Sequence, residues 1–384
     1  MKINVVLVGN GDDISMQMFD AWYAYKQSQS SANDMSIDVE FNISENIVPG
    51  HTNILMTTMS TSVPSNIDDF DLIFFTNVLE SCSISTDTVV NNMFRENAYF
   101  INGSTVLPTH NWASKFYNPQ LNVVILKDFL TRQFYPQYYN AFQDRTKDRT
   151  CTMTFINGAN RAHRYYFHRL LDEGCPEVHQ RSSLGTMVHE TDDAYFESDD
   201  DSKFRIWVNE YAVDKIVRNI DTDYLYYENS IPVGINSKFG KVALGMFLLP
   251  EYWNSHCVIF PESSWVNNSL HITEKSVKCF FAECFPWPVA GSNINKIYNT
   301  LGFYTAWNLL PSELQKFDSI TDHCTRYQMQ ITAIKWLYNN TSVFNTKEAK
   351  DMLRSNYLNF HSYKPIIGAM QQLDNILEKH ERRH

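Results

Sequence analysis

Two lysines one helical turn apart, Lys275 and Lys278, are the residues whose type and spacing most directly indicate chemistry. A polar loop precedes them, and that loop follows the apolar run at 256–260. Apolar residues then recur at helical spacing over 277–284. The free N–H groups at the start of a helix favour an anion. Together with the two lysines, they predict a site for a phosphate-bearing ligand.

The elements that must position these lysines can be read from the same stretch. Residues 256–260 predict a strand, and Thr273 stands at the expected N-cap of the helix, with Glu274 in its first turn. Residues 287–290 predict a second short strand after that helix. The stretch is therefore interpreted as a strand, a loop, a helix and a second strand.

A second cationic helix start follows the predicted strand at 151–156. The loop after it begins with Asn157 and carries Arg161, His163 and Arg164 where the next helix starts. Cations at a helix N-terminus oppose the macrodipole unless an anion or a carboxylate compensates. Two interpretations stay open, namely a diphosphate clamp, or pairing with Asp and Glu on the domain surface or between domains.

Two further loops carry paired aspartates. Asp221 and Asp223 could hold a divalent cation that bridges a nucleotide diphosphate, because carboxylate oxygens suit such ions. The residues before this pair look like a helix end, where a strand would be expected. Asp12 and Asp13 follow a predicted strand at 3–8, in a glycine-containing loop that lacks the G-x-G-x-x-G spacing. That loop is interpreted as a tight turn.

Length and composition limit the classes of protein. The chain has 384 residues, 43% of them hydrophobic and 14% aromatic, which predicts two domains with ample cores. A net charge of −11 and a pI near 5.5 argue against a surface-wide nucleic-acid footprint but leave a local basic groove open.

The chain is expected to be soluble and cytoplasmic, without a membrane partner. Its N-terminal apolar run is too short for a signal peptide, and no apolar run is long enough to cross a bilayer. There are seven cysteines, an odd number, and no C-x-x-C motif. Cys257, Cys279 and Cys284 lie in apolar runs and are expected to be buried thiols.

The fold class predicted from the strand pattern is α/β. Fully apolar strands separated by helix-length gaps indicate a parallel sheet covered on both faces. A polar stretch at 135–149 predicts the boundary between an N-terminal domain, 1–148, and a second domain, 149–325, with C-terminal helices at 326–384. Strands are expected at 3–8, 36–42, 71–75, 98–101, 122–126, 151–156, 184–188, 256–260 and 287–290, and an extended stretch at 303–307. Helices are expected at 14–23, 165–171, 203–220, 274–284, 292–301, 320–338, 346–360 and 366–379.

The second half resembles a known family. Glu262 and Ser264, followed by I-T-E-K at 272–275, are similar to the donor-binding signature of the alpha-1,3-fucosyltransferases. Their resemblance to a group of fucosyltransferase-like glycosyltransferases from phages and large viruses is stronger still. Further similarities, in the same order along the chain from about 150 to 365, are N-G at 157–158, R-A-H-R at 161–164, T-E-K-S-V-K at 273–278, P-W-P-V-A-G at 286–291, L-G-F at 301–303 and N-Y-L-N at 356–359. The chain departs from the pattern at Pro261 and Ser263.

The resemblance implies a GT-B fold, in which two Rossmann-like domains face each other and the C-terminal helices pack across them. The C-terminal domain would bind a nucleotide-sugar donor and the N-terminal domain an acceptor. Basic residues and helix dipoles would stabilise the departing diphosphate, so no metal or other cofactor is expected. The implied donor-binding residues are Asn157, Arg161, Arg164, Glu262, Ser264, Thr273, Glu274, Lys275 and Lys278.

Specific roles follow from that resemblance. Arg161, Arg164, Lys275 and Lys278 would neutralise the diphosphate, and Glu262 or Glu274 would hold sugar or ribose hydroxyls. A carboxylate or histidine of the first domain would deprotonate the acceptor, and the candidates for this catalytic base are Asp12, Asp13 and His110. A purely structural role is the alternative, because Glu274 and Lys278 are spaced as an i,i+4 pair that stabilises a helix without any ligand.

Three acceptors are compatible with the sequence, namely a hydroxymethylated DNA base, a glycan and a protein. The enzyme would act in a bacterial or phage-infected cytoplasm. Basic residues around the domain junction could line a groove for DNA; they are Lys115, Lys127, Arg132, Arg145, Lys147 and Arg149. Two other classes of function compete with the transferase. One is a non-catalytic nucleotide- or glycan-binding protein, and the other is a metal-dependent GT-A enzyme that uses Asp221 and Asp223.

Overall fold

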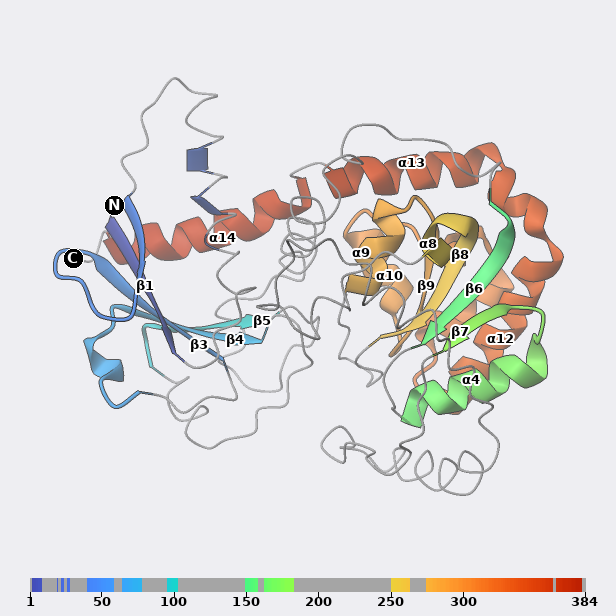
Figure 1. Cartoon of the computed structure of the whole chain (residues 1–384), viewed down its shortest axis with the longest axis horizontal. Coiled ribbons are helices and arrows are strands. Elements are labelled where there is room, and N and C mark those ends of the chain that lie inside the picture. Colours follow the sequence, from blue (N-terminus) through green and yellow to red (C-terminus); the bar gives the residue numbers. More distant parts are fainter. Residues whose placement is uncertain are drawn as a thin grey trace, which may run out of the picture. The chain divides into compact units, whose positions relative to one another are not determined.

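A computed structural model represents the chain (Figure 1). It describes residues 2–8, 19, 22, 23, 26, 27, 40–58, 64–77, 95–102, 149–157, 162–182, 250–262, 274–361 and 364–381. The chain divides into two compact units. The first contains strands β1 to β5 and the last helix, α14, and the second contains the elements from β6 to α13. The strands predicted at 122–126 and 184–188 and the helix at 203–220 lie outside the described residues.

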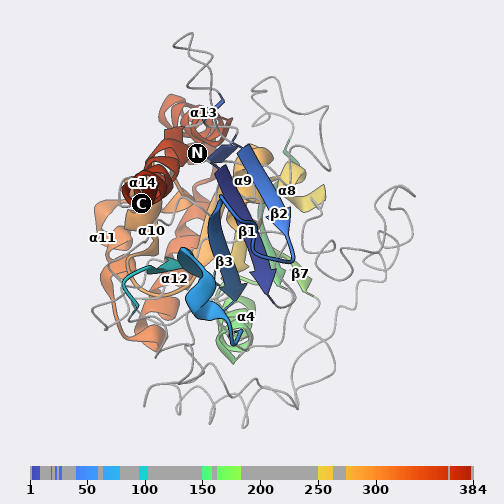
Figure 2. The ribbon, with the colours of Figure 1, turned by 90° about the vertical axis from the view of Figure 1, so that its left-hand side faces the viewer.

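The first unit is built on a parallel sheet of five described strands in the order β2-β1-β3-β4-β5. Figure 2 shows β2, β1 and β3 lying side by side. The bounds are Lys2–Val8 (β1), Glu40–Ser44 (β2), Thr52–Thr58 (β3), Leu72–Asn77 (β4) and Ala98–Asn102 (β5), with a 3₁₀ turn, η1, at Ile67–Asp69. The strands predicted at 3–8, 71–75 and 98–101 are confirmed, and the strand predicted at 36–42 overlaps β2, which extends to Ser44. The central strand β3 was not predicted, because threonine and asparagine flank its short apolar stretch.

The C-terminal helix α14, Lys364–Glu381, belongs to this first unit. Its Asp374 accepts a hydrogen bond from the indole nitrogen of Trp22 at 3.4 Å and pairs with the ammonium of Lys26 at 2.7 Å. Trp22 and Phe19 are fully buried. The ring centroid of Phe19 lies 6.0 Å from that of Phe74 in β4. A segment about 350 residues away in sequence thus completes the core of the N-terminal sheet.

The second unit is built on a parallel sheet of four described strands in the order β7-β6-β8-β9. The bounds are Cys151–Asn157 (β6), His179–Ser182 (β7), Ser255–Pro261 (β8) and Phe285–Val289 (β9). The strands predicted at 151–156, 256–260 and 287–290 are confirmed, and the last begins two residues earlier. The strand β7 was not predicted because its sequence, H-Q-R-S, has no apolar pattern. Both sheets are parallel, as the pattern predicted.

Helices of the second unit follow the predicted periodicity with one correction. Residues 303–307 were expected to be extended, but a 3₁₀ turn, η7, begins at Ala306. The side-chain oxygen of Asn308 accepts a hydrogen bond from the backbone N–H of Thr305 at 2.9 Å and stabilises this turn. The bounds are Ala162–Gly174 (α4), Pro250–Asn254 (α8), Glu274–Phe281 (α9), Ile294–Thr300 (α10), Ala306–Leu309 (η7), Ser312–Gln315 (α11), Lys316–Ser319 (η8), His323–Asn339 (α12), Thr341–Asn345 (η9) and Lys347–His361 (α13).

Helices α4 and α12 pack together on one face of this sheet (Figure 1). The ring centroids of Phe155 in β6 and Phe167 in α4 lie 5.8 Å apart. The ring of Phe167 also packs edge-on against that of Tyr327 in α12, with the centroids 5.6 Å apart. Gly174 ends α4 where a Cβ atom would overlap the side chain of Ile331. The absence of a side chain at Gly174 therefore allows the two helices to approach each other closely.

Helices α9, α10 and α13 lie on the other face (Figure 1). Phe280 of α9 stacks on Phe303 with ring centroids 4.1 Å apart, and Phe281 meets Phe360 of α13 edge-on at 6.2 Å. The thiols of Cys257, Cys279 and Cys284 are free and fully buried, which confirms their expected place in the core. Within the described ranges, no helix is both long and apolar enough to span a bilayer.

Candidate functional site

The strand order of the second sheet reverses between β6 and β8. From β6 the chain passes to β7 on one side, whereas β8 pairs with β6 on the other side. Open α/β sheets usually bind their ligands outside the carboxyl ends of the strands at such a reversal. Strand β6 ends at Asn157, and Glu262 directly follows β8. These two predicted residues therefore lie at the carboxyl edge where the order reverses.

The backbone of Glu262 connects the end of β8 to β9 and α4. Its N–H donates to the carbonyl of Val289 at 2.9 Å. Its carbonyl oxygen lies 3.2 Å from Nε2 of His163 and accepts a bond from the guanidinium of Arg164 at 3.5 Å. A carbonyl can only accept, so Nε2 is the protonated nitrogen of this imidazole. The cationic start of α4 is thus attached to the end of β8, across 99 and 98 residues of sequence.

The carboxylate of Glu262 is fully buried. Its Oε1 accepts hydrogen bonds from the hydroxyl of Ser276 in α9, at 3.0 Å, and from that of Tyr298 in α10, at 3.4 Å. The two hydroxyl oxygens also lie within hydrogen-bonding distance of each other. Burial and the nearby Glu262 carboxylate raise the pKa of Tyr298 well above its ordinary value. These bonds hold the first turn of α9 against the end of β8.

Neither Ser276 nor Tyr298 was predicted to belong to this site. Ser276 lies inside the T-E-K-S-V-K run, so its position two residues beyond Glu274 was visible in the sequence. The sequence did not show that the Ser276 side chain points toward Glu262, because this direction depends on where β8 lies beside α9. The sequence around Tyr298 indicated a helix but no role for this residue in the site.

Lys275 and Lys278, the two lysines of the predicted anion site, differ in their surroundings. Lys275 lies in the first turn of α9 and is partly exposed. Lys278 is only 6% exposed, and its ammonium lies 5.8 Å from the ring centre of Tyr252 in α8. Helix α8 directly precedes the amino end of β8, whereas the expected ligand position is at the carboxyl end. This contact favours a packing role for Lys278 and leaves Lys275 as the lysine nearest the predicted anion.

The structure describes some of the remaining predicted donor residues. Asn157 is 3% exposed at the end of β6, and Arg164 is also 3% exposed. The backbone of Glu274 begins α9, in agreement with the predicted helix start. The other predicted site residues lie outside the described residues, namely Arg161, Ser264, Thr273, the catalytic candidates Asp12, Asp13 and His110, and the alternative pair Asp221 and Asp223. Among the described residues, no group of three His, Cys, Asp or Glu side chains could hold a metal ion.

Arg149 was predicted to help line a basic groove for DNA, but its guanidinium is bound inside the second unit. It donates to the carbonyls of Tyr252, Trp253 and Ser255, at 3.1, 2.9 and 2.6 Å. It also donates to the carbonyls of Ala282 and Glu283, at 3.0 and 2.7 Å. Helix ends leave such carbonyls without partners, and a basic side chain can satisfy them. Arg149 thus joins the C-terminal ends of α8 and α9. The other five basic residues of the predicted groove lie outside the described residues.

Two of the sequence motifs are in contact in the second unit. The L-G-F turn at 301–303 follows α10, and N-Y-L-N at 356–359 lies in α13. Asn359 donates to the carbonyl of Gly302, and Asn356 binds both backbone groups of Tyr304. Gly302 has a φ of +80°, and a Cβ there would overlap the side chain of Asn359. The two motifs therefore form one structural clamp.

No family model and no curated protein matches this chain. Among solved structures, the chain is similar to a crystal structure of an alpha1,3-fucosyltransferase, with 12% sequence identity and a TM-score of 0.45. The alignment covers 98% of this chain and 90% of that chain.

Proposed function

We propose that the chain is a glycosyltransferase that uses a nucleotide-sugar donor. The second unit would bind the donor diphosphate at the carboxyl ends of β6 and β8, and the first would hold the acceptor, as in the GT-B arrangement. One observation carries this proposal. The cationic start of α4 and the glutamate after β8, 98 residues apart, meet at the reversal of strand order, where doubly wound sheets bind ligands.

The electrostatics of this edge suit a diphosphate. Helices α4 and α9 connect parallel strands, so both begin at the carboxyl edge of the sheet. Their N-terminal N–H groups carry partial positive charge, and His163, Arg164 and Lys275 lie in the same first turns. Fixed positive groups aimed at a departing diphosphate stabilise the charge that develops as the sugar is transferred. A site of this kind would need no metal ion for the transfer.

The buried carboxylate of Glu262 would act mainly on the geometry of the site. Because its Oε1 is bound to Ser276 and Tyr298, we assign it the positioning of the α9 start, and the hydroxyls of the sugar would fall to Glu274 and Ser264. Arg164 would act at the same edge with Arg161. Asp12, Asp13 and His110 stay our candidates for the base that deprotonates the acceptor hydroxyl.

The first experiment measures donor binding and transfer together. The chain is incubated with UDP-, GDP- and CDP-sugars, and nucleotide binding is followed by calorimetry and thermal shift. Lys275→Ala should weaken binding of the preferred nucleotide by about 1.5–3 kcal/mol, because a charge-assisted hydrogen bond is lost. Lys335→Ala, at an exposed position on α12, is the matched control and should keep the affinity. Absence of both turnover and thermal shift across the panel would disprove the proposal.

Further arms separate the alternatives. Loss of activity in EDTA would favour the metal-dependent enzyme that uses Asp221 and Asp223, whereas retained activity supports our proposal. Nucleotide binding without transfer to any acceptor would favour a non-catalytic binding protein. Glycans and hydroxymethylated DNA are offered as acceptors in parallel, and the one that gains radiolabel from the donor identifies the acceptor class.

A further inference from the structure

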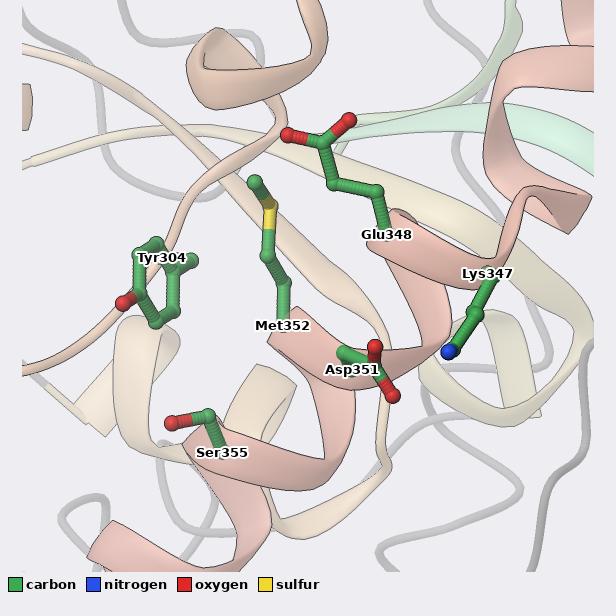
Figure 3. Close-up of a pocket in the computed structure, with 6 residues that line it drawn as sticks. All are labelled: Tyr304, Lys347, Glu348, Asp351, Met352 and Ser355. Carbon is green, nitrogen blue, oxygen red and sulfur yellow. The ribbon is translucent and has the colours of Figure 1, made fainter.

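A pocket of about 640 Å³ lies on the second unit between α13 and the turn after α10 (Figure 3). Its volume falls within the range of about 300–1,000 Å³ that is typical of small-molecule sites. None of its lining residues takes part in the edge formed by β6 and β8. They are Tyr304, Lys347, Glu348, Asp351, Met352 and Ser355.

Tyr304 is held rigidly at the side of this pocket. Its backbone N–H donates to Oδ1 of Asn356 at 2.6 Å, and its carbonyl accepts from Nδ2 of the same side chain at 2.7 Å. Asn356 is itself 1% exposed, and the neighbouring Gly302 is held by Asn359. The backbone that carries the Tyr304 ring is therefore held in place before any ligand arrives, which lowers the entropic cost of binding.

The opposite side of the pocket is one stripe of α13. Glu348, Met352 and Ser355 recur at helical spacing and face the pocket, with Asp351 beside them (Figure 3). Within the part of the chain that the structure describes, no side chain forms a hydrogen bond or ion pair with the Tyr304 hydroxyl, Glu348, Asp351 or Ser355. Acceptors, hydroxyls and an ammonium, that of Lys347, thus surround an apolar surface made by one ring and one thioether.

We propose that this pocket binds a neutral saccharide, at a site separate from the donor edge. A sugar ring has an apolar C–H face, which suits the Tyr304 ring and the Met352 thioether. Its hydroxyls donate to carboxylates, which only accept, and accept from the ammonium of Lys347. Two carboxylates and one ammonium leave the pocket with a net negative charge, which disfavours nucleotides and other phosphate-bearing ligands.

The proposal is tested by saccharide binding in the absence of nucleotide. Wild-type protein is titrated with glucose, galactose, N-acetylglucosamine and N-acetyllactosamine, followed by saturation-transfer NMR and calorimetry. We expect saturable binding of at least one of them. Tyr304→Ala should weaken it about tenfold, the upper value for an aromatic contact, while Tyr304→Phe keeps most of it. Asp351→Asn should weaken it about tenfold through loss of charge-assisted hydrogen bonds.

Matched controls make the result decisive. Glu313→Gln, at an exposed carboxylate on α11, should bind like wild type, and all variants should keep the wild-type melting temperature. Lys275→Ala should also bind the saccharide normally, so failure at the donor edge and failure at this pocket give different results. Tighter binding by the disaccharide than by its monosaccharides would indicate a glycan as the source of the sugar, and equal binding a free sugar. No saturable binding, equal affinity in Tyr304→Ala, or preference for adenosine over every sugar would overturn the proposal.

Discussion

The side-chain amide of Asn356 binds Tyr304 through both of its backbone groups. Its Oδ1 accepts from the N–H at 2.6 Å, and its Nδ2 donates to the carbonyl at 2.7 Å, across 52 residues of sequence. An amide is the side chain that offers a donor and an acceptor in the geometry of a peptide group. The pair joins the turn after α10 to helix α13 and sets the backbone position at the pocket.

Replacing this amide should destabilise the second unit. Asn356→Ala leaves both backbone groups of Tyr304 without their partner, and we expect a loss of about 2 kcal/mol or more in the free energy of unfolding. Urea denaturation followed by tryptophan fluorescence measures this loss. Asn345→Ala, an exposed asparagine of η9, should change the free energy by about 0.5 kcal/mol or less. Equal stability of the two variants would show that the clamp contributes nothing.

Arg149 should not tolerate a change to lysine. Its guanidinium binds five carbonyls at the ends of α8 and α9, and an ammonium has neither the fork geometry nor the number of donors to do so. Arg149→Lys should cost about 3 kcal/mol, since hydrogen bonds to charged groups contribute about 1.5–3 kcal/mol each and are not additive. Arg169→Lys in α4, at a half-exposed i,i+4 ion pair, is the control, with an expected cost below about 0.5 kcal/mol. A wild-type denaturation midpoint for Arg149→Lys would contradict this role.

The first turn of α9 should depend on its hydroxyl bond to Glu262. Ser276→Ala removes a donor from a fully buried carboxylate, and we expect a loss of about 1.5–3 kcal/mol in stability together with weaker nucleotide binding. Ser319→Ala, at an exposed hydroxyl of η8, should leave both quantities unchanged. If Ser276→Ala bound nucleotide like wild type despite lower stability, the proposed positioning of α9 for the donor would be wrong.

Stability should fall as the solution is acidified below neutral pH. Burial and the neighbouring Arg326 lower the pKa of His323 to about 3, and burial and Arg149 lower the pKa of His256 to about 4. The ordinary pKa of histidine in the unfolded chain is 6.5, so the unfolded chain binds protons first. The stability that neutral His323 and His256 contribute is thus present above pH 6.5 and is lost as the pH falls toward 4.

Urea denaturation at constant ionic strength between pH 7 and pH 5 tests this expectation. His323, which is buried, should lower the free energy of unfolding by up to about 1.4 kcal/mol per pH unit below 6.5, and the half-buried His256 by less, because solvent screens its charge. His323 accepts a hydrogen bond from Arg326, and His323→Asn keeps a side-chain acceptor but removes the titrating group. This variant should therefore show a shallower loss. The same slope in both proteins would mean that His323 does not titrate as its burial predicts.

The local pattern of the chain was sufficient for most elements of both sheets. Strands β1, β4, β5, β6, β8 and β9 have apolar runs that end at polar loops, and burial on both faces of a parallel strand needs only that pattern. The strands β3 and β7 were not predictable, since Thr52–Thr58 mixes threonine with a few apolar residues and His179–Ser182 is polar. Strands of this kind are stabilised by the neighbours on either side, which no local window contains.

By itself the sequence determined the α/β class, the parallel sheets, the start of helix α9 and the residues that bring positive charge to two helix starts. Only the tertiary structure decided the partners of those residues. It attached His163 to Glu262, buried the Glu262 carboxylate against Ser276, and placed Lys278 over Tyr252. The physical reason is distance along the chain. Helical and strand periods arise from neighbouring residues, whereas strand order decides which groups a hundred residues apart meet at one edge of a sheet.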